Sequence, residues 1–253
     1  MCKIVKILCI SLLSGAFASS NSFGGTGPLR TWSAETAGHL KASFGLSGRG
    51  SPDEAKIASK RFLHHYEDTE TVDSNGTEID EVLDLSFRLF ASLGYTEYAD
   101  FGIMLPIHAD SYRKAQTEIH QDLKNIDGVG LGDLEIWGKL QYPPYEHSHI
   151  FDMAFLGMLS FPTGAKETGF VPKESFYIPV EGSKNTKFFS ADAITAKVMM
   201  LWTLNFDEWL RVPFKWHVNY GLHTTFTDDL GNSFLLNSAV VYTPNPIFDI
   251  FLD

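Results

Sequence analysis

The chain has 253 residues, of which 44% are hydrophobic and 20% charged, with a formal net charge of −11 and a mean hydropathy of −0.06. Past the N-terminus there is no apolar run of about 20 residues, which excludes a bundle of membrane-spanning helices. The acidic balance, without a basic patch, argues against a nucleic-acid partner. A β-barrel stays compatible with these values, because its lipid-facing apolar residues alternate with polar ones.

The N-terminus has the pattern of a secretory signal peptide. Lys3 and Lys6 form a basic start, residues 7–13 are mostly apolar, and Ala16-Phe17-Ala18 provides a small-x-small cleavage site. This pattern predicts a leader over residues 1–18 that is too short to span a membrane. Both cysteines lie inside this leader, so the exported chain is expected to contain no disulfide.

Strict alternation of apolar and polar residues predicts antiparallel strands after an irregular lead at residues 19–37. In the clearest run, Leu83 to Tyr95, the odd positions are apolar and the even positions are nearly all polar or small. The two parities of the sixth run are poorly separated, which leaves its facing open. In chain order, strands are expected at residues 39–46, 82–95, 99–108, 133–142, 150–161, 188–204, 214–226 and 234–243, and a ninth begins at residue 247.

The connections between these runs alternate in length. Bacterial outer-membrane barrels have short periplasmic turns and longer extracellular loops, and each strand needs about 9–11 residues to cross the bilayer. Several runs reach that length, and the short set is expected on the periplasmic side. The long connections cover residues 47–79, 109–130, 162–187 and 227–232, and the short ones cover residues 96–98, 143–148, 205–211 and 244–246.

Aromatic residues gather beside the short turns, as in the belts that mark a membrane interface. They are Tyr95, Tyr98, Tyr142, Tyr145, Trp209 and Tyr242. The sequence therefore predicts an all-β, antiparallel, up-and-down transmembrane β-barrel over residues 38–253. Because single-chain bacterial barrels have even strand numbers, eight full strands plus part of a ninth predict an incomplete barrel. Such a chain should show an open seam or a strained eight-strand closure.

Two motifs carry a resemblance to known proteins. Gly130-Leu131-Gly132-Asp133-Leu134, with Gly138-Lys139, and the strand end Phe161-Pro162-Thr163-Gly164 resemble outer-membrane channel proteins of the phenol-degradation meta-pathway type. This resemblance covers roughly residues 130–221 and implies passage of small hydrophobic or aromatic molecules. Gly27-Pro28-Leu29-Arg30, with Ser33-Ala34-Glu35-Thr36, also resembles the start of barrels fused to OmpA-like peptidoglycan-binding domains. Neither resemblance implies catalytic residues.

Several charged or polar side chains fall on the parity that should face the lumen. Charges of both signs can form an interior salt-bridge core that plugs a narrow barrel, or can set the selectivity of a solute pathway. The strand number decides between these, because barrel width grows with it. The predicted lumen-lining residues are Lys41, Asp84, Arg88, Asp133, Glu135, Lys139, Lys215 and His217.

No motif predicts catalysis, a cofactor or a metal centre. His64-His65 and His147-Ser148-His149 lack further ligands at metal-site spacing, and no Gly-x-Ser-x-Gly elbow occurs. We therefore expect a non-enzymatic passive pore or transporter in the cell outer membrane. Its expected partners are outer-membrane lipid, the barrel-assembly machinery and a small, possibly hydrophobic, solute. The alternatives are a structural barrel anchor of an OmpA-like envelope protein and a secreted soluble β-sandwich that binds glycans.

Overall fold

The computed structural model describes residues 31–50, 81–113, 126–142, 150–165, 173, 189–227, 231–245 and 248–252. In these ranges the protein is all-β and antiparallel, apart from helix α2 (Phe206–Leu210). The strands are β1 (Ala42–Gly50), β2 (Glu81–Thr96), β3 (Ala99–Arg113), β4 (Ile126–Leu131), β5 (Leu134–Tyr142), β6 (Phe151–Phe161), β7 (Thr195–Asn205), β8 (Phe214–Thr225), β9 (Ser233–Asn245) and β10 (Phe248–Leu252).

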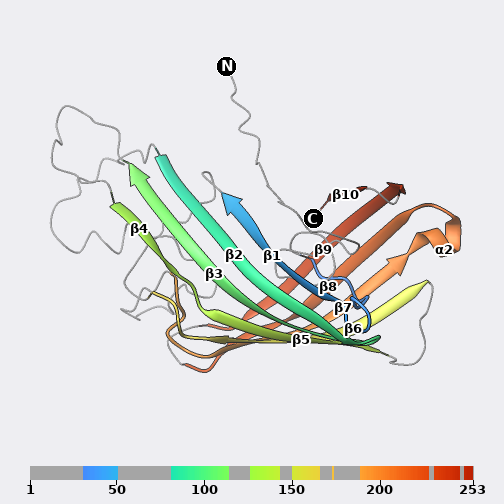
Figure 1. The fold of residues 1–253 in the computed structure, drawn as a ribbon, viewed down its shortest axis with the longest axis horizontal. Helices are drawn as coiled ribbons and strands as arrows, with labels where there is room; N and C mark the ends of the chain where they lie inside the picture. The colour runs from blue at the N-terminus through green and yellow to red at the C-terminus, as the bar shows by residue number, and fades with distance from the viewer. Residues whose placement is uncertain are drawn as a thin grey trace, which may run out of the picture.

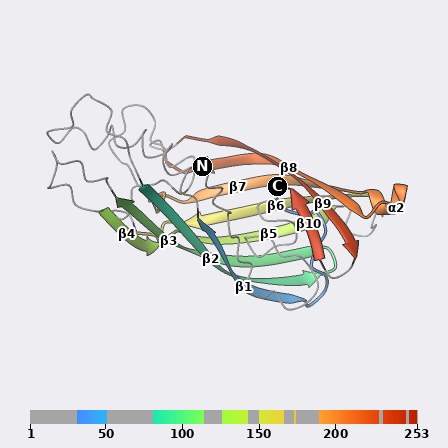
Figure 2. The same ribbon diagram turned by 90° about the horizontal axis from the view of Figure 1, so that it is seen from above.

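These strands form a single ten-stranded sheet that curls into a trough, or half-barrel (Figure 1). The strand order is β1-β2-β3-β5-β6-β7-β8-β9-β10, and β4 also pairs with β3. Figure 2 shows β5 and β6 along the middle of the trough, with β2 and β3 on one side and β7 and β8 on the other. Within the described strands, β1 and β10 end the order without pairing to each other. Of the two predicted outcomes, an open seam and a strained eight-strand closure, the described strands show the first, and their single sheet does not fit a two-sheet sandwich.

Each predicted strand region contains a strand, but several bounds differ. β1 begins and ends later than predicted, and the strand expected from residue 188 begins only at Thr195. The predicted turn at residues 205–211 contains α2, whose N-cap Asn205 accepts a hydrogen bond from the Asp207 N–H. The connection expected at residues 109–130 is partly strand, because β3 extends to Arg113 and β4 follows.

The sequence pattern missed β4 because a β-bulge separates it from β5. β3 pairs with both strands, through Ile107↔Leu131 on β4 and Met104↔Glu135 on β5. The β4–β5 side therefore has one residue more than β3 between these two pairs, which is the definition of a bulge. Inward-facing residues change from even numbers on β4 to odd numbers on β5, so the alternation breaks at the bulge.

The two faces of the sheet are opposite in character to those of a soluble sheet, which turns its apolar side toward a core. The alternation predicted for residues 83–95 holds, with Ser86 buried and Phe87, Leu89 and Leu93 exposed. β7, whose facing the sequence left open, turns its odd positions inward. The outer face exposes large apolar side chains on most strands, including Phe44, Leu89, Ile103, Ile136, Phe155, Leu159, Val198, Trp202, Leu222 and Leu236.

Outer aromatic side chains pair across neighbouring strands. Ring centroids lie 6.2 Å apart in Tyr95–Phe101, 6.5 Å in Tyr142–Phe155, 5.7 Å in Phe151–Trp202 and 5.8 Å in Trp202–Tyr220. Of the predicted aromatic belt, Tyr95, Tyr142 and Tyr242 are exposed and Tyr98 is half-buried, whereas Tyr145 and the Trp209 side chain lie outside the described residues. Among the described helices, none has the length and apolar character needed to cross a membrane.

Candidate functional site

Residues 31–37, which precede β1, lie on the concave inner face of the sheet, and we name this segment the strap. Its first four residues, Thr31 to Ala34, are buried. The strap forms no strand, in agreement with the irregular lead predicted there. Its position inside the trough was not predicted, because an apolar residue such as Trp32 in a short irregular segment gives no periodic signal.

Asn219 on β8 and Thr203 on β7 bind the backbone of the first half of the strap. The Asn219 amide accepts a hydrogen bond from the Trp32 N–H at 2.7 Å and donates one to the Trp32 carbonyl at 2.8 Å. Thr203 Oγ1 accepts from the Ala34 N–H at 2.9 Å. Both wall residues are fully buried, so these hydrogen bonds satisfy polar groups that water does not reach.

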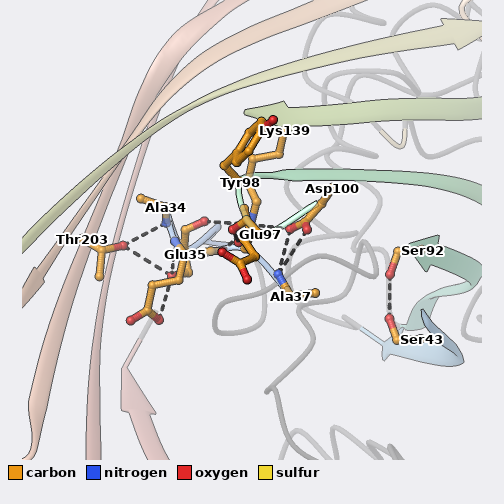
Figure 3. A network of polar contacts seen from close by, with 12 residues as sticks. Ala34, Glu35, Ala37, Ser43, Ser92, Glu97, Tyr98, Asp100, Lys139 and Thr203 are labelled. Atoms are coloured by element: carbon orange, nitrogen blue, oxygen red, sulfur yellow. Dashed lines mark hydrogen bonds and ion pairs between the residues drawn. The ribbon is translucent and has the colours of Figure 1, made fainter. Parts of the chain in front are cut away.

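Lys139 on β5 and Asp100 on β3 bind the backbone of the strap between Ser33 and Ala37 (Figure 3). Lys139 Nζ donates to the carbonyls of Ser33 at 3.3 Å and Glu35 at 2.5 Å. Both Asp100 carboxylate oxygens accept from the Ala37 N–H at 3.1 Å. The two wall residues also form a buried ion pair of 3.1 Å. Removing either partner would leave an uncompensated buried charge.

The strap also inserts two side chains into the wall. Trp32 packs edge-to-face on Trp137, with ring centroids 4.8 Å apart. The pair belongs to a buried apolar cluster on the inner wall, completed by Ala34, Ala154, Leu156, Met158, Met199 and Leu201. Glu35 Oε1 accepts a hydrogen bond from Lys215 Nζ on β8 at 2.6 Å. Because about a third of each side chain is exposed, this ion pair is partly screened by solvent.

The environment of Glu35 gives strap docking a pH dependence. Burial alone raises the pKa of the carboxyl, but the Lys215 ammonium, His217 and the Ser33 hydroxyl together hold it below the usual value for a glutamate. The stabilisation from a carboxylate with a lowered folded-state pKa is fully present above the unfolded value and is lost as the pH falls through the folded one. The pair therefore contributes its full stabilisation at neutral pH and loses it in acid.

We expect the strap to exchange amide hydrogens faster in acid than at neutral pH, after correction for intrinsic exchange rates. Hydrogen exchange of the peptide that contains residues 31–40, followed by mass spectrometry, measures this. Lys215→Gln should raise the amide exchange rate of the strap at neutral pH and reduce the increase in that rate on acidification, because the neutral amide of glutamine no longer stabilises the Glu35 carboxylate. If the increase in exchange on acidification is as large in this variant as in the unmodified protein, the pH dependence does not come from Glu35.

A second group of contacts surrounds the bulge at Asp133 and joins the two motifs noted in the sequence. The buried Asp133 carboxylate accepts hydrogen bonds from the Gly164 N–H at 2.9 Å and the Ala191 N–H at 2.8 Å. Thr163 Oγ1 accepts from the Leu134 N–H at 2.9 Å. A Cβ at Gly164 would lie 2.9 Å from Asp133 Oδ1 and from backbone atoms on two segments, so the close approach requires glycine.

The Asp133 carboxylate also holds residues 189–191 against the inner wall. The ring of Phe189 is fully buried and lies 5.2 Å from the His108 ring, measured between centroids. Lys173 Nζ lies 4.9 Å from the centroid of Phe189 and forms an ion pair with Asp110. His108 Nδ1 in turn shares a hydrogen bond of 2.9 Å with Ser86 Oγ. The inner wall is therefore covered around the bulge as well as under the strap.

The structure places most of the predicted lumen-lining residues on the inner wall. Asp133, Glu135, Lys139 and His217 are buried there, and Lys215 is partly exposed. Glu35 contacts Lys139 and Lys215, whereas Glu135 forms a separate 3.8 Å ion pair with Lys197. His217 Nδ1 shares a hydrogen bond with Thr203 at 2.9 Å. Arg88 is half-buried in β2, Lys41 is exposed just before β1, and the side chain of Asp84 lies outside the described residues.

Sequence reasoning missed Asp100, Thr203 and Asn219. Asp100 and Asn219 both fall on the inward parity of a predicted strand, which was the available signal. The candidate histidine pairs at residues 64–65 and 147–149, like the leader, lie outside the described residues. Within the described ranges there is no cluster of three metal-ligating side chains. No family model matches the chain, and no curated protein or solved structure matches it either.

Proposed function

We propose that this protein is an outer-membrane β-barrel protein that serves as a passive pore or transporter for small solutes, hydrophobic ones included. The observation that carries the proposal is the sheet itself, which has an apolar outer face and an inner wall of mixed polar and apolar side chains. Contiguous apolar patches larger than a few hundred Å² are rare on soluble monomers. Outer-membrane strands, by contrast, turn alternate apolar residues toward lipid. The outer aromatic pairs would lie at the membrane interface.

The inner wall has the mixed chemistry that a pathway for small solutes needs. Charges of both signs lie beside the apolar cluster under Trp32. Polar and apolar molecules would therefore both find complementary contacts along the wall. In this proposal the leader exports the chain, the barrel-assembly machinery inserts it, and outer-membrane lipid surrounds its outer face.

One observation favours a second candidate function. The strap and residues 189–191 cover much of the inner wall, and their polar groups are bonded to it. A filled interior suits a structural barrel anchor of an OmpA-like envelope protein, which needs no solute pathway. The conductance of the protein in a planar bilayer separates the pore from the structural anchor.

We expect the full chain, extracted from outer membranes, to migrate faster on an unboiled gel than after boiling, because a continuous ladder of backbone hydrogen bonds across many strands resists detergent. In a planar bilayer it should give discrete conductance steps, with the boiled protein as the control. A heat-modifiable but silent protein would support the anchor instead of the pore. Release into the medium without detergent would contradict both membrane functions.

A further inference from the structure

We infer that the inner wall is a binding site for a short peptide segment, and that the strap occupies this site as a built-in ligand. The inference goes beyond the proposed pore, because binding of a peptide does not require conduction. Three features of the contacts support it. The wall binds backbone groups of the strap, the wall side chains that do so are buried, and the wall also holds particular strap side chains.

The wall recognises main-chain groups. Asn219 binds both the N–H and the carbonyl of one strap residue, Trp32. Thr203 and Asp100 each accept from a backbone N–H, and Lys139 donates to two backbone carbonyls. Every peptide carries these groups, so such contacts recognise a main chain in the bent conformation of the strap with little dependence on its side chains.

The recognising groups are too polar and too buried to act as simple filler. Asn219 and Thr203 are fully buried, and the side chains of Lys139 and Asp100 are 0% and 2% exposed. They come from four different strands and converge on one segment. A wall that only had to be filled would be more stable with apolar side chains, since a buried polar group that lacks a partner is costly. A segment that replaces the strap must therefore match the hydrogen-bond donors and acceptors that these groups present to it.

The side chains of the strap define which peptides fit best. An aromatic residue is held against Trp137, at the position of Trp32. Three residues later an acidic residue reaches Lys215, at the position of Glu35. The two residues between them, Ser33 and Ala34, are buried, which restricts these positions to small side chains. The expected ligand is a peptide segment with the pattern aromatic, small, small, acidic that takes the bent conformation of the strap.

The test uses the full chain in detergent with its strap loosened by Trp32→Ala and Glu35→Gln. The probe is a synthetic peptide of the strap sequence, TWSAETA, with blocked ends, and binding is measured by calorimetry. We expect saturable 1:1 binding to the loosened variant and at least about tenfold weaker binding to the unmodified chain, whose own strap competes. Methylating the peptide nitrogen at the position of Ala34 removes the donor to Thr203 and should weaken binding.

Two wall variants, each made in the loosened chain, complete the test. Asn219→Ala removes two backbone hydrogen bonds and should weaken peptide binding about tenfold or more. Asn237→Ala is the matched control, because Asn237 is the register partner of Asn219 on β9 and makes no hydrogen bond to the strap in the described part of the chain. It should leave binding unchanged.

Two outcomes would overturn the inference. The first is no saturable binding to a loosened chain that is still heat-modifiable. The second is equal binding of the peptide and a scrambled, methylated version. Conductance of the same preparations tests the pore separately: binding with silent bilayers would support the peptide site and contradict the pore, and conductance without binding would do the reverse.

Discussion

Replacing Ile136 by arginine should lower the free energy of unfolding in lipid vesicles by about 2–4 kcal/mol. Ile136 lies on the outer face of β5 and is 45% exposed, and its register partners Ile103 and Leu159 are outward-facing apolar residues. If the outer face contacts lipid, the guanidinium must enter the hydrocarbon region, where a charge at the midplane costs this amount. On a water-facing surface the same substitution would change stability by about 0.5 kcal/mol or less.

Denaturant titration in vesicles, monitored by tryptophan fluorescence, measures the difference. Ile136→Gln separates the cost of charge from the loss of apolar contact. Phe226→Arg tests how the energetic cost depends on depth in the membrane. Phe226 lies just past the end of β8, and arginine near the interface costs only about 0–1 kcal/mol. Equal and small effects at both positions would show that the outer face is in water and would contradict the outer-membrane proposal.

Alternation predicted the sheet well wherever one strand keeps a single parity throughout. β2 and β8 are such strands, with polar or small residues inward and large apolar residues outward, and their predicted facing is confirmed. Prediction failed where parity changes, as at the bulge beside Asp133, because one extra residue moves every later side chain to the other face. It also failed at the start of β7, since Phe189, Ala191 and Ile194 are apolar but lie outside the strand, which begins at Thr195.

The candidate site was only partly predictable for a different reason. Inward parity identified Lys139, Lys215 and Glu135 on the wall, because that property depends on the strand alone. What each residue contacts depends on which segment folds back into the trough. Trp32 of the strap bonds to Asn219, which lies 187 residues further along the chain, and no local sequence pattern encodes a pairing over that separation. The strap could be predicted as irregular, but not as a ligand of the wall.

The strap also decides how the proposed pore and the peptide site relate. A bound strap fills part of the inner wall, so solute passage and strap docking would compete for the same surface. The strap variants designed for peptide binding should therefore also change conductance, in the direction of larger steps when docking weakens. A conductance that is independent of the strap would place the solute pathway elsewhere on the inner wall.

Replacing Asp133 by alanine should destabilise the protein by about 2–6 kcal/mol, because two backbone N–H groups lose their acceptor and each unsatisfied buried group costs about 1–3 kcal/mol. These groups belong to Gly164 and Ala191, which lie on segments 31 and 58 residues from Asp133 in sequence. The bulge aims this one carboxylate at both segments, so a single residue joins the β4–β5 junction, the end of β6 and the approach to β7. Besides Asp133, a hydrogen bond from the Leu134 N–H to Thr163 joins the first two of these segments.

Asp133→Asn is the matched variant, since its amide keeps one acceptor oxygen and should lose about half as much stability. Unfolding in denaturant gives the global effect, and hydrogen exchange at residues 189–195 shows whether release begins there. Because the strap bonds to β3, β5, β7 and β8 and not to the bulge, its protection should persist in Asp133→Asn. Loss of strap protection in this variant would mean that the two groups of contacts on the inner wall form one cooperative unit.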